Sequence, residues 1–189
     1  MNAPIVPRWE WRTFGDDFGP AEGKFAALTP ERVQESDEVY VLSTKSDASV
    51  KVRDGLMDVK HLEHVNEDGL EQWIPVLKRA VPLDSADIAT LFAALGVPGP
   101  PTGTVTYDEF LATIEATPAL RLTRVHKRRA RYTVGGCMSE LSTKCGTSEA
   151  FQVAAEARAF LAGRGIEVSG EQQTKTRKAL DYFSEALKA

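Results

Sequence analysis

Two stretches of the sequence carry basic side chains at every second position. The first contains Lys51 and Arg53, and the second contains Lys127, Arg129 and Arg131. Successive side chains of a β-strand point to opposite faces of the sheet, so we expect the members of each set to share one face. Such a face can bind a phosphate chain, because arginine matches phosphate oxygens with two parallel N–H groups and lysine adds a point charge.

The second stretch lies in a strongly positive part of the chain. Between residues 121 and 144 there are seven Lys or Arg and a single acid, Glu140. Like charges about 4 Å apart repel by about 4 kcal/mol at an effective dielectric constant near 20, so a stack of cations is easier to maintain when an anion neutralises it. One interpretation is therefore a site for a polyanion. The alternative, which stays open here, is the water-exposed face of an antiparallel sheet.

The patterns around these residues predict an antiparallel sheet. Alternating runs typical of strands occupy residues 8–14, 38–44, 48–54, 57–65, 70–79, 119–134 and 137–145. Asp54 and Gly55 lie between two of these runs, and this dipeptide indicates a hairpin turn. Pro75 lies inside the run of residues 70–79, which indicates an edge strand or a bulge there. Residues 16–37 are predicted to form a loop with at most one short helical turn.

Helical patterns interrupt and follow the strands. Residues 84–118 contain two runs with the apolar spacing of helices, and the second opens with Thr106 three residues before Glu109, as in a capping box. We expect a helical insertion there and a C-terminal helix over residues 171–189. Residues 147–165 fit either one helix or a strand that leads into a helix. The whole chain, residues 1–189, is thus predicted to be one α+β domain built on an antiparallel sheet or barrel.

Composition limits the classes of function. The 189 residues carry a net charge of −4 and two cysteines, and no apolar run approaches the length of a membrane span, which indicates a soluble cytoplasmic protein. Nucleic acid is disfavoured as a partner, because Tyr132 is the only aromatic residue of the second basic stretch and its parity is opposite to that of Lys127. Glycine-rich phosphate and dinucleotide motifs are absent. A three-residue spacing places His61 and His64 on opposite faces of a strand, which disfavours a zinc site.

The order of these segments resembles the CYTH superfamily of triphosphate tunnel proteins, which includes class IV adenylyl cyclases, thiamine triphosphatases and inorganic triphosphatases. The resemblance extends over roughly residues 8–160 and is carried by a Glu-containing first strand, SVKVRDG, MDVKHL, a helical insertion, VHKRRARY and CMSEL. It implies an eight-stranded antiparallel tunnel. Inward basic residues of this tunnel hold a triphosphate, and inward carboxylates hold Mg²⁺ or Mn²⁺.

The resemblance also implies roles for individual residues. The phosphate-binding residues would be Lys51, Arg53, Lys60, Lys127, Arg129, Arg131 and Arg12. The metal ligands would be Glu10, Glu140 and Glu156, and the catalytic residues would be Glu10 and Lys60. The implied ligand is a small phosphorylated anion: a nucleoside triphosphate, thiamine triphosphate, inorganic triphosphate or polyphosphate.

The chain departs from the family pattern in its acidic residues. The first strand of the family carries Glu-x-Glu-x-Lys, whereas this chain has Arg8, Glu10 and Arg12, and Ala154 stands where a further carboxylate is expected. Each lost carboxylate weakens a site for a hard divalent cation. The sequence therefore predicts either metal-dependent hydrolysis of a triphosphate or polyphosphate, or capture of a polyanion without turnover. A basic face that docks an acidic protein partner is a third interpretation, and the sequence leaves the substrate and the oligomeric state open.

Overall fold

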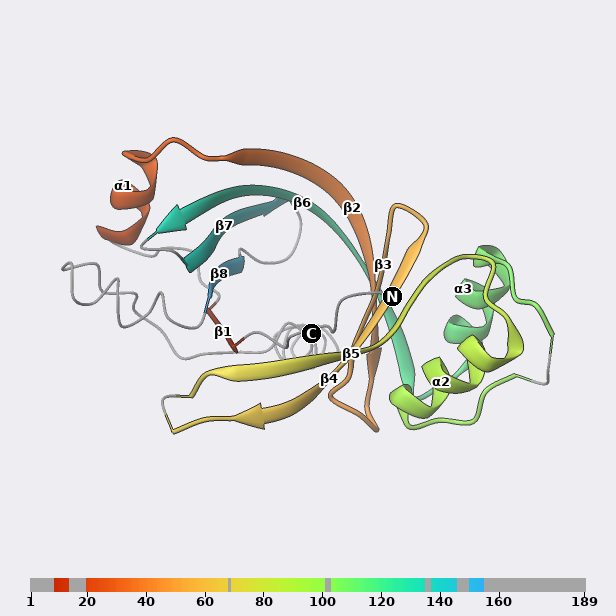
Figure 1. The fold of residues 1–189 in the computed structure, drawn as a ribbon. Coiled ribbons are helices and arrows are strands. Elements are labelled where there is room, and N and C mark those ends of the chain that lie inside the picture. The colour runs from red at the N-terminus through yellow and green to blue at the C-terminus, as the bar shows by residue number, and fades with distance from the viewer. Residues whose placement is uncertain are drawn as a thin grey trace, which may run out of the picture. The chain divides into compact units, whose positions relative to one another are not determined.

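The computed structural model describes residues 9–13, 20–67, 69–100, 103–134, 137–145 and 150–154. These residues form an α+β fold with a curled antiparallel sheet and, within the described ranges, three helices (Figure 1). In chain order the elements are β1 (Trp9–Thr13), α1 (Pro20–Ala26), β2 (Arg32–Ser43), β3 (Ser49–Arg53), β4 (Leu56–Val65), β5 (Glu71–Ala80), α2 (Ser85–Leu95), α3 (Tyr107–Ala116), β6 (Leu120–Val134), β7 (Cys137–Cys145) and β8 (Ala150–Ala154). The α+β class with an antiparallel sheet, predicted from the sequence, is confirmed.

The chain divides into two compact units. The first comprises Met1–Glu35, Leu62–Ile74 and Lys127–Gln173, and the second comprises Ser36–His61, Pro75–His126 and Thr174–Ala189. Strands β2, β4, β5 and β6 each contribute residues to both units. The division therefore does not follow the order of the chain.

The first unit is built around β1. This strand pairs antiparallel with β5 and with β8, β8 pairs with β7, and β6 follows as the neighbour of β7. Helix α1 buries Ala21 and Phe25, and the ring of Phe25 meets that of Tyr132 on β6 edge-on, with centroids 5.1 Å apart. Because Tyr132 alternates with Arg131, α1 packs on the face of β6 opposite to its alternating cations.

The second unit contains the β2–β3–β4 ladder, in which β3 pairs antiparallel with both neighbours. Asp54 and Gly55 connect β3 to β4 with φ angles of 52° and 71°. Positive φ at both central residues is the geometry of the tight hairpin turn that Asp-Gly favours. The hairpin predicted at these two residues is confirmed.

The hydrophobic core of the second unit joins the sheet to α2 and α3. Its members include Val50, Val52, Met57, Val59, Leu91, Phe92, Leu95, Phe110 and Ile114. Val50 and Val52 alternate with Lys51 and Arg53 along β3. Burial of the valines against this core therefore turns the basic residues to the other face of the strand.

Helices α2 and α3 are the two helices expected within residues 84–118. The carboxylate of Asp84 accepts the first-turn N–H of Asp87, and Gly96 ends α2 in the left-handed conformation at φ 70°. Thr106 and Glu109 form the predicted capping box at the start of α3. These caps satisfy backbone groups that a helix end leaves without an intrahelical partner, so local sequence fixes both ends of α2 and the start of α3. That this segment is an insertion in the domain stays a prediction.

Other predicted segments differ from the structure or fall outside the described residues. The expectation of a loop over residues 16–37 is wrong in part, because α1 and the first six residues of β2, Arg32 to Asp37, occupy much of it. In residues 147–165 the structure describes only β8. The expected helix over 171–189 lies outside the described residues. Pro75 lies within β5, three residues beyond Gln72, which pairs with Trp9 of β1. Among the described helices, none combines the length and apolar character needed to cross a bilayer.

Candidate functional site

In the second unit, the face of the sheet opposite to the core is charged. The β2–β3 ladder sets Glu38 opposite Arg53, and the β3–β4 ladder sets Lys51 opposite Asp58. Directly opposed residues of an antiparallel pair share a face, so the predicted common face of Lys51 and Arg53 is confirmed. Lys60, half-buried and two residues beyond Asp58, lies on this face as well.

Glu38 lies at the centre of this charged face. Its side chain is fully buried, with Arg53 Nη1 3.5 Å from Oε1 and Lys51 Nζ 3.9 Å from Oε2. The hydroxyl groups of Ser36 and Tyr40 both donate hydrogen bonds to the same carboxylate. One buried anion thus contacts two cations of the neighbouring strand and two hydroxyls of its own strand. Glu38 was not among the site residues predicted from the sequence.

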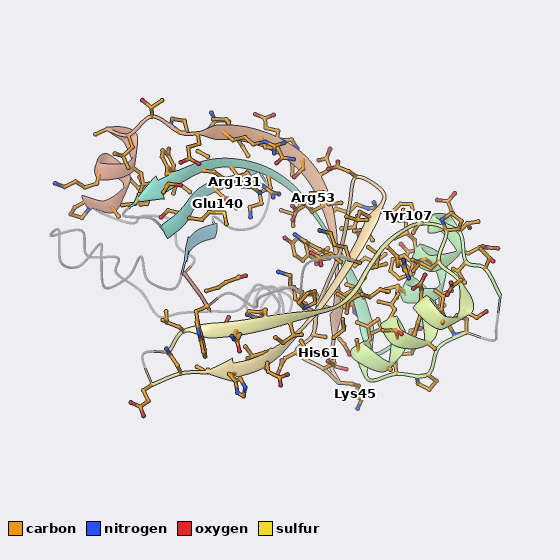
Figure 2. The ribbon with its side chains drawn as sticks, in the orientation of Figure 1. Lys45, Arg53, His61, Tyr107, Arg131 and Glu140 are labelled. Atoms are coloured by element: carbon orange, nitrogen blue, oxygen red, sulfur yellow. The ribbon has the colours of Figure 1, made fainter. Side chains whose placement is uncertain are left out.

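A second buried carboxylate, Glu140 on β7, has similar surroundings in the first unit. Lys127 Nζ lies 3.1 Å from Oε1, and Arg131 Nε donates a hydrogen bond of 3.2 Å to Oε2. Ser142 donates to Oε1 at 2.8 Å from two residues further along β7. Figure 2 shows Arg131 and Glu140 side by side. Both oxygens of Glu140 are therefore engaged by groups of this chain.

The cations of β6 are deeply buried for their type. Lys127 is 1% exposed and Arg129 is 3% exposed, whereas the side chain of Arg131 is 29% exposed. Residues of these types are rarely buried to this extent unless they are paired. Lys127 and Arg129 therefore do not lie on an open, water-exposed face of the sheet.

Strand β1 brings one further predicted residue, Glu10, to the same face as Glu140. In the backbone register, Glu10 lies opposite Ala154, Arg12 lies opposite Gln152, and Gln152 lies opposite Glu140. Residues 152 and 154 share one face of β8, so Glu10 and Glu140 occupy one face of the β1–β8–β7 sheet. The side chain of Arg12 and the whole of Glu156 lie outside the described part of the chain.

Acidic residues of neighbouring strands stand among the cations. Glu38 belongs to β2 and reaches Arg53 of β3 only through strand pairing, so the acids close in sequence to the cations do not include it. Glu71 of β5 is a third buried acid; it lies opposite Glu10 and accepts a 2.8 Å hydrogen bond from Trp73 Nε1. The signal that could have found Glu38 is the alternation of Ser36, Glu38 and Tyr40 on a strand adjacent to β3.

The described carboxylates do not form a set that suits a divalent cation. No group of three His, Cys, Asp or Glu side chains within the described ranges could hold a metal ion. Mg²⁺ and Mn²⁺ require several oxygen ligands. Glu140 already contacts Lys127, Arg131 and Ser142, so a metal at that carboxylate would have to displace a cation. The metal-ligand roles implied for Glu10, Glu140 and Glu156 stay predictions.

Comparisons with known proteins identify the fold. No family model and no curated protein sequence matches the chain. Among solved structures, the PH1012 protein from Pyrococcus horikoshii OT3 is similar at 16% identity and a TM-score of 0.51, over 93% of this chain and 99% of that one. HpAC1 from Hippeastrum, described as a candidate adenylyl cyclase with a dominant triphosphatase activity, matches at 14% identity and a TM-score of 0.48, over 89% and 92%. A candidate adenylate cyclase from Bacillus halodurans matches at 11% identity and a TM-score of 0.49, over 89% and 94%.

The descriptions of two of these structures name an adenylyl or adenylate cyclase, an activity found in the family that the sequence resembles. At such low identity the likeness concerns the fold and does not extend to activity or ligand. The match to PH1012 covers nearly the full length of both chains. The chain therefore has the fold of the PH1012 protein.

Proposed function

We propose that this chain binds a triphosphate or polyphosphate on the charged face of its sheet, within an eight-stranded antiparallel tunnel of the CYTH kind formed by a single domain. The observation that carries the proposal is the burial of Lys127 and Arg129. Removing a cation from water costs several kcal/mol even after relaxation, and apolar residues would stabilise the same space more readily. Buried cations on one face of a sheet suit an anionic ligand, which supports the proposal.

Strand β6 brings three cations to one face. Lys127, Arg129 and Arg131 alternate along this strand, and the carboxylate of Glu140 on β7 contacts the first and the last of them. A phosphate chain bound along β6 would meet a row of basic side chains.

The spacing of these cations favours a chain of phosphates over a single phosphate. Alternate residues of an antiparallel strand are about 7 Å apart, so the row from Lys127 to Arg131 extends for about 14 Å. A linear polyanion can contact all three side chains at once. Arginine and lysine are also the side chains best suited to phosphate oxygens.

The test is binding of tripolyphosphate, pyrophosphate, orthophosphate and ATP, measured by calorimetry and by the shift in melting temperature. We expect tripolyphosphate to bind more tightly than orthophosphate and its affinity to fall as salt rises. Arg129→Ala should weaken tripolyphosphate binding roughly tenfold, the usual cost of losing a hydrogen bond to a charged group. The matched control is Arg128→Ala, which removes the same charge one residue away, on the opposite face, from a side chain that is 52% exposed. Equal losses in the two variants would argue against a site on this face.

Hydrolysis of the bound chain with Mg²⁺ or Mn²⁺ is the second candidate. It is favoured by the common face of Glu10 and Glu140 and requires Glu140 to exchange a cation partner for the metal. Glu10 and Lys60 are the catalytic residues that the resemblance implies. The measurement is release of orthophosphate from each anion with and without Mg²⁺ or Mn²⁺. Metal-dependent release that disappears in Glu10→Ala would establish this candidate. The cytoplasmic setting predicted from the sequence stays part of the proposal.

A further inference from the structure

Glu38 is a buried acid on the basic face, which is unexpected for a site that attracts anions. A carboxylate there repels a phosphate chain and costs free energy to bury. Its contacts suggest a compensating role: Oε1 lies 3.5 Å from Arg53 Nη1, and Oε2 lies 3.9 Å from Lys51 Nζ. The carboxylate lies between the two cations of β3 that the sequence predicts to bind phosphate.

The surroundings of Glu38 hold its carboxylate in one place. Ser36 and Tyr40, two residues before and two after it on β2, donate their hydroxyl groups to its two oxygens. Tyr40 is itself 7% exposed and packs with Leu42 and Val125. The acid is therefore anchored to β2 by hydrogen bonds whose donors belong to the same rigid strand.

The two cations are accessible to a ligand. Arg53 contacts Glu38 through Nη1 at 3.5 Å and Asp54 through Nε at 3.9 Å, and its guanidinium carries five N–H groups in all. The side chains of Lys51 and Arg53 are 16% and 29% exposed, so a ligand can reach both. Without the carboxylate between them, two like charges on one face would move apart.

The same arrangement occurs again in the first unit, at Glu140. That carboxylate also accepts a hydroxyl from two residues along its own strand, Ser142, and contacts two cations of a neighbouring strand, Lys127 and Arg131. The recurrence on different strands indicates that a buried acid that orders a pair of cations is a feature of this sheet.

We infer that Glu38 is a positioning residue for phosphate binding: held by Ser36 and Tyr40, it fixes Lys51 and Arg53 in the geometry that a phosphate chain requires. This inference rests on the proposed function. It assigns a role to a residue that carries the wrong charge to contact the ligand. It also predicts that loss of the Glu38 charge weakens anion binding, whereas simple electrostatics predicts that loss of a negative charge strengthens it.

The experiment compares tripolyphosphate affinity by calorimetry in four proteins: wild type, Glu38→Gln, Tyr40→Phe and Asp37→Asn. Asp37→Asn is the matched control, because it removes the same charge from the adjacent residue of β2, whose side chain is 89% exposed and contacts His126. Glu38→Gln should bind roughly tenfold more weakly, and Tyr40→Phe, which keeps the ring packing, roughly threefold more weakly. Asp37→Asn should remain within about twofold of wild type.

A second comparison separates positioning from general damage to the fold. In a Lys51→Ala, Arg53→Ala background, Glu38→Gln should cause no further loss of affinity, because the cations that it positions are gone. An equal loss in that background, or unchanged or tighter binding by Glu38→Gln, would overturn the inference. If Glu38→Gln does not fold, wild-type affinity in Tyr40→Phe overturns it instead. Absence of binding by the wild-type protein itself would overturn the proposed function, whereas binding by wild type that is insensitive to Glu38 overturns only the positioning role.

Discussion

Replacement of Glu140 by Gln removes a negative charge that contacts two cations. The side chain of Glu140 is 10% exposed, with Lys127 Nζ at 3.1 Å and Arg131 Nε at 3.2 Å from the carboxylate oxygens. Glutamine has nearly the same shape and can still accept a hydrogen bond from Ser142. The substitution therefore tests the charge and leaves the packing almost unchanged.

The expected loss of stability follows from the distances and the burial. Two unit charges 3.1 Å apart attract by about 5 kcal/mol at an effective dielectric constant near 20. The side chain of Arg131 is 29% exposed and can regain water when the carboxylate is lost, whereas the side chain of Lys127 is 2% exposed and cannot do so without movement. Removal of one partner of a buried pair costs about 3–5 kcal/mol. We expect the lower end, about 3 kcal/mol, which corresponds to a fall in melting temperature of about 10 °C for a chain of this size.

The assay is urea unfolding and thermal melting of both proteins in EDTA, so that metal binding does not contribute. The control is Glu35→Gln, because the Glu35–Arg128 pair is separated by 3.7 Å and both side chains are more than half exposed. Such surface pairs contribute about 0–1 kcal/mol, so the control should unfold close to wild type. If Glu140→Gln were as stable as wild type, the contacts of Glu140 with Lys127 and Arg131 would not stabilise the fold. The conclusion that groups of this chain engage both oxygens of Glu140 would then be wrong.

The remaining predictions concern the helices. Asp84→Ala should destabilise the protein by about 1 kcal/mol in urea unfolding, because it removes the N-cap of α2. Gly96→Ala should lower the free energy of unfolding by about 1–2 kcal/mol, because φ is 70° and a Cβ would lie 3.1 Å from the carbonyl oxygen of Lys45. A variant as stable as wild type would contradict this strain. The pKa of Glu109 is lowered from 4.5, first by the backbone N–H of Thr106 and then by its hydroxyl. The ionised Glu109 side chain therefore stabilises the fold fully above pH 4.5, and this stabilisation is lost as the pH falls through the pKa of the folded state, which is lower than 4.5. The difference in melting temperature between wild type and Glu109→Gln should shrink only in that acidic range.

Local sequence determined the elements whose signals lie within a few residues. Alternation placed Lys51 and Arg53 on one face of β3, because the side-chain period of a strand is two whatever the strand pairs with. Asp54 and Gly55 formed the expected turn, since their positive φ values arise from the residue types themselves. The start of α3 followed from the capping box for the same reason. The loop expected over residues 16–37 was wrong in part, because the two buried residues of α1 give too short an apolar pattern to predict a helix.

The partners of the cations were decided only by the tertiary structure. Glu38 is 15 residues from Arg53 in the chain, and Glu140 is 9 residues from Arg131, so no local pattern links them. Pairing of β2 with β3 brings Glu38 to Arg53, and burial then makes each ion pair matter far more than it would in water. The sequence by itself established that cations share a face. Which acids contact them, and that Lys127 and Arg129 lie in the interior, depended on strand register and burial, which arise from the packing of the whole sheet.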